Sequence, residues 1–376
     1  MWSLYKQIDQ ARRWQGRLLD VAGLGPQEAP HRVVHSESGF HLKAYADHQA
    51  EGPVLLMVPA PIKRAYIWDL APGASAVRHC LSNGIRVYLI EWERPVPKQQ
   101  DTGLAEYADR FILAALEAVA AETGQQRLFV AGHSLGGTFG AIFAALYPER
   151  VQGLILLEAP VHFAQHAGAF APLVALAPRA QFLTNALGNI SGTFLNQMSY
   201  LASPMAFGGA RWVDWFLSLP DAEAVQIHLR VERWTLDEMP LPRQLFEEVV
   251  EELYREDQFM GGTLIVNGRA AVAEGIGAPL LSVVDRRSRV VPPESVLPFH
   301  EAAHNPDRQV LWYEGDKGVA LQHVGVLVGK NAHQHLWPEI LEWIFDHSSP
   351  ACRPQIPDRA PPRARAGSDH RGKSPS

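Results

Sequence analysis

Cysteine is almost absent from this 376-residue chain, which contains only Cys80 and Cys352. Two cysteines cannot make a disulfide framework, so the composition favours a reducing compartment. Long hydrophobic runs are also missing: no stretch reaches the roughly 18 apolar residues that a bilayer span requires, and we expect no transmembrane segment. Because charge appears within the first ten residues and no apolar signal-peptide core follows, we expect a cytoplasmic protein.

An excess of charge of one sign is lacking as well. The formal net charge is −6, and the isoelectric point is about 6.2. This weakly acidic balance gives no reason to expect nucleic acid or an anionic membrane as a partner. The sequence shows neither a cluster of metal-ligand residues nor a glycine-rich phosphate loop, so we expect no metal and no cofactor. What is present, 47% hydrophobic and 20% charged residues, is typical of a globular enzyme.

Apolar runs of strand length alternate with helical stretches along most of the chain. Continuous apolar runs are typical of strands buried in a parallel sheet. The alternation therefore predicts an α/β protein with a mostly parallel central sheet that helices cover on both faces. The expected strands are 53–58, 85–90, 128–130, 151–157, 279–284 and 309–313, and the expected helices are 107–121, 138–146 and 337–345.

Four kinds of segment can be distinguished. Residues 1–30 are predicted to form an N-terminal helix and a loop, and residues 31–160 and 263–348 the α/β core. The stretch 161–262 contains long apolar and aromatic helical segments and no clear strand, so we expect a helical cap whose aromatic side chains help to line the active-site pocket. Residues 349–376 are rich in Pro, Arg, Ser and Gly, and we expect this tail to be disordered.

The strongest local motif is the G-x-S-x-G pattern at residues 132–136, which stands between the strand 128–130 and the helix 138–146. A sharp turn from strand into helix exposes a serine hydroxyl, and the flanking glycines avoid collisions with neighbouring backbone. The start of the helix also provides free amides and a positive dipole near a developing oxyanion. We therefore predict that Ser134 is a nucleophile in an α/β-hydrolase fold.

An oxyanion hole requires two backbone amides. One should be the N–H of Leu135, directly after the nucleophile, and the second should come from the loop after the strand 53–58. Pro59 and Pro61 have no N–H to donate. This leaves Ala60 or Ile62, and we favour Ile62.

Sixteen histidines are present, so position must select the general base. In this fold, the base follows the last strand and precedes the last helix. His323 occupies that place, and Gly325 permits a close approach of the backbone. His133, inside the G-x-S-x-G pattern, is expected to pack structurally.

These residues and several separate segments resemble the polyhydroxyalkanoate synthases, especially the short catalytic subunit of the two-subunit type. The resemblance extends over roughly residues 30–346. It implies an α/β-hydrolase fold with a cap, a hydroxyacyl-CoA substrate, and possible association with a polyester granule or a synthase-type partner subunit. The matching segments, in order along the chain, are 58–70, 75–78, 91–92, 158–163, Trp234, 254–257 and the region of His323.

Two departures from this family concern the catalytic residues. The synthases carry Cys where this chain has Ser134, and their catalytic Asp corresponds to Ser288 here. Without an acid, an imidazole is neither oriented nor stabilised when it becomes charged. The local sequence around Glu158, at the end of the strand after the nucleophile helix, is similar to that of haloalkane dehalogenases that place a catalytic Glu there. We therefore favour Glu158 as the acid, with Asp285 as the alternative and a degraded site as the third possibility.

The predicted function is that of a serine-dependent acyl hydrolase or acyltransferase. It would act on acyl or hydroxyacyl esters or thioesters through an acyl-enzyme on Ser134. One alternative is polymerisation of hydroxyacyl-CoA, as the resemblance implies. Another is a granule-associated pseudoenzyme that binds polymer or a synthase partner through the cap.

Overall fold

The computed structural model describes residues 2–45, 51–163 and 168–349, so the predicted tail beyond Ser349 lies outside the described residues. The strands are β1 (Arg32–Glu37), β2 (Phe40–Ala44), β3 (Val54–Val58), β4 (Asp69–Ala71), β5 (Ala74–Ser75), β6 (Arg86–Trp92), β7 (Leu128–His133), β8 (Val151–Leu157), β9 (Leu264–Val266), β10 (Arg269–Ala271), β11 (Leu280–Asp285) and β12 (Arg308–Tyr313). The helices are α1 (Trp2–Leu19), α2 (Ala76–Ser82), α3 (Phe111–Thr123), α4 (Leu135–Leu146), α5 (Ala171–Leu176), α6 (Ala180–Leu187), α7 (Gly192–Ala202), α8 (Ala210–Ser218), α9 (Ala222–Thr235), α10 (Arg243–Glu248), α11 (Leu297–Ala302), α12 (Gly325–Val328) and α13 (Trp337–Asp346).

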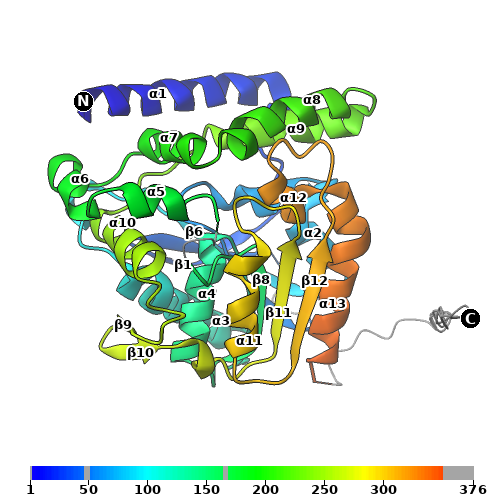
Figure 1. Ribbon diagram of the computed structural model, residues 1–376. Helices are drawn as coiled ribbons and strands as arrows, with labels where there is room; N and C mark the ends of the chain where they lie inside the picture. Colours follow the sequence, from blue (N-terminus) through cyan, green and yellow to red (C-terminus); the bar gives the residue numbers. More distant parts are fainter. Residues whose placement is uncertain (1, 46–50, 164–167, 350–376) are drawn as a thin grey trace, which may run out of the picture.

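An eight-stranded sheet forms the centre of the molecule, in the order β1-β2-β6-β3-β7-β8-β11-β12. From β6 to β12 neighbouring strands are parallel, while β2 pairs antiparallel with both β1 and β6. The predicted mostly parallel sheet is thus confirmed. The β1–β2 hairpin and the small β9–β10 hairpin were not among the expected elements. In Figure 1 the arrowheads of β11 and β12 point toward the helices of the cap.

Each face of the sheet carries its own hydrophobic core, because successive side chains along a strand point to opposite faces. In β3, Val54, Leu56 and Val58 belong to the core beneath α3 and α4. Leu55 and Met57, which point to the opposite face, belong to the core beneath α2 and α13. Burial on both faces explains why β3 is apolar without interruption, and it holds the carboxyl end of this strand in place.

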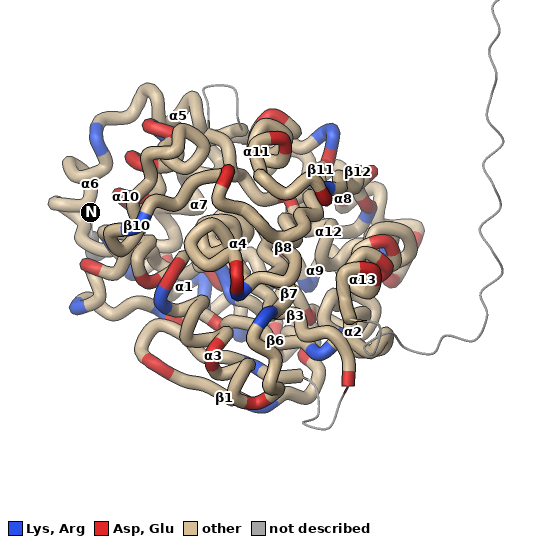
Figure 2. Tube along the Cα trace, turned by 90° about the horizontal axis from the view of Figure 1, so that it is seen from below, with Lys and Arg blue, Asp and Glu red and all other residues tan. Residues whose placement is uncertain are grey.

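In the described part of the chain, six α-helices, α5 to α10, follow β8 and lie across the carboxyl ends of the strands (Figure 1). The separate β9–β10 hairpin comes next, and the chain re-enters the central sheet at β11. Figure 2 shows Lys and Arg interspersed with Asp and Glu around the outline of the molecule. In the ranges that the structure describes, no helix has both the length and the apolar character that crossing a bilayer demands.

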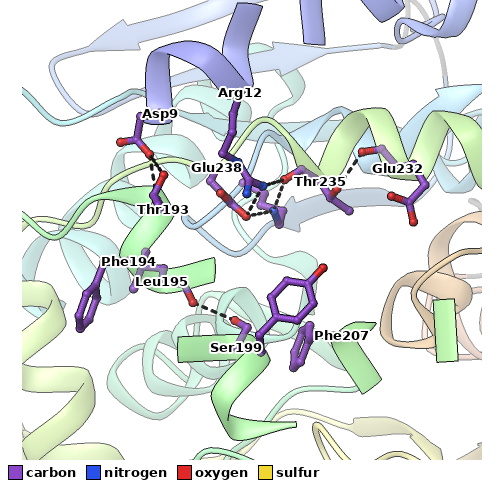
Figure 3. Close-up of polar contacts among 12 residues, drawn as sticks. Asp9, Arg12, Thr193, Phe194, Leu195, Ser199, Phe207, Glu232, Thr235 and Glu238 are labelled. Atoms are coloured by element: carbon purple, nitrogen blue, oxygen red, sulfur yellow. Dashed lines mark hydrogen bonds and ion pairs between the residues drawn. The ribbon is translucent and has the colours of Figure 1, made fainter. Parts of the chain in front are cut away.

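The N-terminal helix α1 docks on the cap helices (Figure 1). Asp9 accepts a hydrogen bond from the N–H of Thr193 at 2.9 Å. Arg12 donates to the carbonyl of Thr235 and to Glu238 Oε1, both at 3.0 Å (Figure 3). These contacts join α1 to α7 and to the end of α9, so that α1 is part of the cap layer.

Candidate active site

Ser134 occupies the turn between β7 and α4, with φ 55° and ψ −134°. A residue other than glycine in the left-handed region costs roughly 1–3 kcal/mol and persists only where its surroundings enforce it. The neighbours of Ser134 leave no room for side chains: a Cβ on Gly132 would lie 2.4 Å from Gly137 Cα, and one on Gly136 would lie 2.2 Å from the Val58 oxygen. Both glycines of the motif are therefore required by close backbone packing. The helix begins at Leu135, three residues earlier than the sequence suggested.

His323 lies in the loop between β12 and α12, and its Nδ1 is 2.8 Å from Glu158 Oε2. If Nδ1–H donates to this carboxylate, Nε2 carries the lone pair that a general base requires. Nε2 is buried and has no hydrogen-bond partner in the described part of the chain. Burial lowers the pKa of His323 to about 4, so the imidazole is neutral near pH 7.

Glu158 directly follows β8 and is 1% exposed. Its φ is 42°, a second left-handed residue at the site, and its N–H donates to the Val283 carbonyl of β11 at 3.0 Å. Burial raises the pKa of the Glu158 carboxyl well above its usual value, the nearby Asp285 raises it further, and the hydroxyl of Ser288 partly offsets the rise. Ser288, which the resemblance places at the acid position of the synthases, thus lies beside the carboxyl group of Glu158.

Asp285, the alternative acid, ends β11 but faces its own turn. Its Oδ1 accepts the N–H of Arg287 at 2.7 Å and lies 3.9 Å from the Nε of the same residue. Among the described residues it makes no hydrogen bond to His323. The structure therefore brings Glu158 to the imidazole and leaves Asp285 as a turn-capping residue.

His133 contributes a contact that the sequence did not predict. Its Nε2 lies 2.7 Å from the backbone oxygen of His323, to which it donates, and the two ring centroids are 4.6 Å apart. The rings of His133 and Trp68 are nearly perpendicular, with their centroids 6.4 Å apart. Burial, together with the neighbouring His323, lowers the pKa of His133 well below its usual value. The only feature of the sequence that could have predicted this contact is the position of His133 next to Ser134.

The two expected oxyanion donors are available. Within the described residues, neither the N–H of Leu135 nor that of Ile62 has a hydrogen-bond acceptor. The loop that carries Ile62 is held from two sides. Trp92 Nε1 donates to the Pro59 carbonyl at 2.7 Å, and the N–H of Met239 donates to the Ile62 carbonyl at 2.9 Å.

The cap also binds this loop through Lys63. The Lys63 ammonium donates to the Thr235 carbonyl at 2.8 Å and to Glu238 Oε1 at 3.0 Å. Arg12 of α1 binds the same two acceptors, which Figure 3 shows side by side. Buried acceptors shared by two cations resist displacement, because releasing either cation would leave a buried carboxylate less well paired. The cap therefore helps to define the position of the Ile62 amide.

A cavity of about 820 Å³ separates the cap from the core and has His323 in its wall. The cap contributes Met205, Leu217 and Ile227, and charged core residues such as Arg287 complete the lining. Among the described residues that line this cavity there is no Phe, Tyr or Trp side chain, but Ser134 does not line it either, so the expectation that cap aromatics line the pocket over Ser134 stays a prediction. Trp212 and Phe216 of α8 are 66% and 64% exposed, because α8 turns that face outward.

Comparison with known proteins agrees with this architecture. Residues 76–316 match the family model described as alpha/beta hydrolase fold, and the chain belongs to that family. The monoacylglycerol lipase of Paleococcus ferrophilus superimposes with a TM-score of 0.51 at 18% identity, covering 79% of this chain and 97% of the lipase, which shows the shared fold alone.

The relatives in sequence are more specific. The chain is 28% identical to the Poly(3-hydroxyalkanoate) polymerase subunit PhaC of Haloferax mediterranei, over 91% of this chain and 69% of the relative. It is 25% identical to the protein of the same name from Allochromatium vinosum, over 90% of this chain and 96% of the relative. The chain is thus an α/β-hydrolase-fold enzyme that is similar to the polyhydroxyalkanoate synthases over most of its length.

Proposed function

We propose that the chain is a serine-dependent acyl-transfer enzyme in which Ser134 is the nucleophile, His323 the general base and Glu158 the acid. The observation that carries the proposal is the 2.8 Å contact between His323 Nδ1 and Glu158 Oε2, in a loop that also contacts His133, the residue before Ser134. A nucleophile, a base and an orienting carboxylate are the parts of a catalytic triad on any fold.

The reaction follows from these roles. Ser134 Oγ attacks the carbonyl carbon of an ester or thioester while His323 Nε2 takes the hydroxyl proton. The N–H groups of Leu135 and Ile62 stabilise the negative oxygen of the tetrahedral intermediate. Its collapse breaks the bond to the leaving alcohol or thiol, which receives the proton from the imidazolium. Water or a second alcohol then attacks the acyl-enzyme, with His323 again as the base.

The nucleophile type favours hydrolysis of esters, or transfer between alcohols, over polymer growth. A serine alkoxide is a more basic and slower leaving group than a cysteine thiolate, whereas chain growth requires the acyl group to leave the nucleophile repeatedly. The second candidate is polymerisation of hydroxyacyl-CoA. It is favoured by similarity to polymerase subunits over about nine-tenths of the chain. A polyester granule or a partner subunit would belong to that second function.

Two measurements test the proposal. A fluorophosphonate probe should label the wild-type chain and leave Ser134→Ala unlabelled, and equal labelling of both proteins would refute the assignment of the nucleophile. Turnover of a hydroxyacyl-CoA and of an oligomeric hydroxyester should then be compared, with release of CoA, free acid and polymer followed separately. Free acid from the oligomer is expected; polymer formation with release of CoA would establish the second candidate instead.

A further inference from the structure

Helix α8 presents its polar side to the interior of the protein. Asp214 and Ser218, one turn apart, are 5% and 0% exposed, while Trp212 and Phe216 face outward. Burying a carboxylate is costly unless hydrogen-bond donors surround it. Ser218 is satisfied within its own helix, because its hydroxyl donates to the Asp214 carbonyl at 2.6 Å. The carboxylate of Asp214 therefore requires partners outside α8.

Those partners lie in the loop that leads to His323. Asp214 Oδ1 accepts the N–H of Gly318 at 2.9 Å, and Oδ2 accepts the N–H of Ala320 at 2.7 Å. His228 of α9 lies with its Nδ1 2.8 Å from Oδ2 and completes the set. One cap carboxylate thus binds two backbone amides of a loop that lies more than 100 residues away in the sequence, immediately before the proposed base.

The loop adopts a conformation that it would not keep on its own. Ala320 has φ 56°, a left-handed conformation that is unfavourable for a residue with a Cβ. Gly318 has φ 76°, and a Cβ there would lie 2.6 Å from the Cβ of Ala224 on α9. Strained backbone of this kind persists where surrounding contacts impose it. The two hydrogen bonds to Asp214 are such contacts.

The cavity between the cap and the core adjoins this connection. Its wall contains Leu217 of α8 and Ile227 of α9, and also Leu321 and His323 of the loop. A displacement of the cap helices relative to the core would therefore change the cavity and pull on the loop backbone through the same carboxylate.

We propose that Asp214 is a positioning residue, which holds the loop 318–320 so that His323 is aligned for proton transfer, and that the cap thereby contributes to the catalytic geometry. This inference rests on the proposed role of His323 as general base. Asp214 does not touch the reacting atoms. Its contribution should appear in the rate of the chemical step, because a misplacement of a catalytic group by about 1 Å costs on the order of 10²-fold in rate.

The test compares Asp214→Asn with a matched control, Glu251→Gln. Glu251 is also a buried cap carboxylate: it is 6% exposed, accepts the N–H of Ala180 at 2.7 Å and pairs with Arg179 and Arg255. None of the contacts of Glu251 with other described residues involves the loop of His323. For each full-length protein, hydrolysis of p-nitrophenyl butyrate gives kcat and KM, fluorophosphonate labelling gives the reactivity of Ser134, and thermal melting gives the stability.

In Asp214→Asn we expect kcat and the labelling rate to fall about 10²-fold with little change in KM. In Glu251→Gln, kcat and the labelling rate should stay within about threefold of the wild type, although the melting temperature should fall about as much as in Asp214→Asn. Wild-type rates in Asp214→Asn, or equal losses in the two variants, would overturn the inference. If Asp214→Asn fails to fold, the variant His228→Gln is measured instead. A reduced kcat in that variant supports the inference, and an unchanged kcat overturns it. Failure of the proposed function is recognised separately, through labelling of Ser134→Ala.

Discussion

Neutralising Glu158 is the sharpest test of the catalytic assignment. Glu158→Gln keeps the volume of the side chain and removes its charge at a position that is 1% exposed. The amide of Gln can present a donor to His323 Nδ1, which favours the wrong tautomer of the imidazole. Nε2 would then carry the proton and could not accept one from Ser134.

Two magnitudes distinguish a triad acid from an ordinary hydrogen-bond partner. Neutralising a triad acid costs about 10⁴-fold in kcat, which corresponds to roughly 5.4 kcal/mol at about 1.36 kcal/mol for each factor of ten. Losing one hydrogen bond to a charged group costs about 1.5–3 kcal/mol, or roughly 10- to 10²-fold. We expect the larger loss, because the contact is short and buried and fixes the tautomer of the base.

The thermal stability of Glu158→Gln should not fall together with its activity. A buried carboxyl whose pKa is raised in the folded state is a liability for folding at any pH above its ordinary pKa, because the unfolded chain then holds fewer protons than the native one. Glu158→Gln should therefore melt no lower than the wild type at pH 7 while turnover collapses. This opposite behaviour separates a catalytic loss from a folding defect.

Ser288 offers a rescue in the same assay. The resemblance to the synthases places Ser288 at the position of their catalytic Asp, and Ser288 lies beside Glu158 in the turn after β11. Ser288→Asp in the Glu158→Gln background should therefore restore about 10²-fold of kcat by supplying a carboxylate from that turn. Asp285→Asn is the control, because Asp285 binds the turn amide of Arg287. An Asp285→Asn variant that loses 10³-fold or more in kcat, beside a Glu158→Gln variant within tenfold of the wild type, would reverse the assignment of the acid.

Four further predictions concern the nucleophile turn and the titration of buried histidines. Ser134→Cys should raise turnover of thioesters relative to oxygen esters, because a thiolate is the better nucleophile and leaving group; an unchanged ratio in parallel assays would show that the nucleophile does not determine the preference. Gly136→Ala should lower the free energy of unfolding by at least about 1–3 kcal/mol in urea titrations, since its Cβ would lie 2.2 Å from the Val58 oxygen; wild-type stability would contradict the packing described. Labelling of Ser134 should hold down to about pH 5 and be half-lost near the pKa of His323, about 4; a midpoint near 6.5 would mean a solvated base. Burial also lowers the pKa of His300 to about 4, so the unfolded chain takes up a proton first as the pH falls below 6.5, and urea midpoints should decrease between pH 6.5 and 4.

The local parts of the site could be predicted because they depend on consecutive residues. An apolar strand, a G-x-S-x-G turn and an apolar helix occupy a single stretch of the chain. Close backbone packing requires both glycines, because a Cβ on Gly132 would collide with Gly137 and a Cβ on Gly136 with Val58 of β3. The place of His323 followed from the order of the strands. The α/β alternation was visible for a similar reason, since β3 and β7 are buried on both faces, and β3 is therefore apolar throughout and β7 apolar up to Gly132.

The cap was harder to predict in detail. Its aromatic residues suggested a pocket wall, but α8 directs Trp212 and Phe216 outward and Asp214 inward. Helical periodicity separates the apolar face of a helix from its polar face. It does not indicate that the polar face of α8, with Asp214, is the one that meets the interior. The buried carboxylate of Asp214 is explained by His228 and by two loop amides, and these amides lie more than 100 residues further along the chain.

By itself, the sequence determined the fold class, the nucleophile turn and the small set of carboxylates that could serve as the acid. Only the tertiary structure shows which of them contacts His323. Glu158 and Asp285 end neighbouring parallel strands, so both carboxylates reach the same edge of the sheet. Glu158 turns toward His323 because its left-handed backbone directs it there, whereas the N–H of Arg287 holds Asp285 in its own turn. These choices depend on backbone conformation and on contacts between distant segments, which the spacing of residues along the chain does not encode.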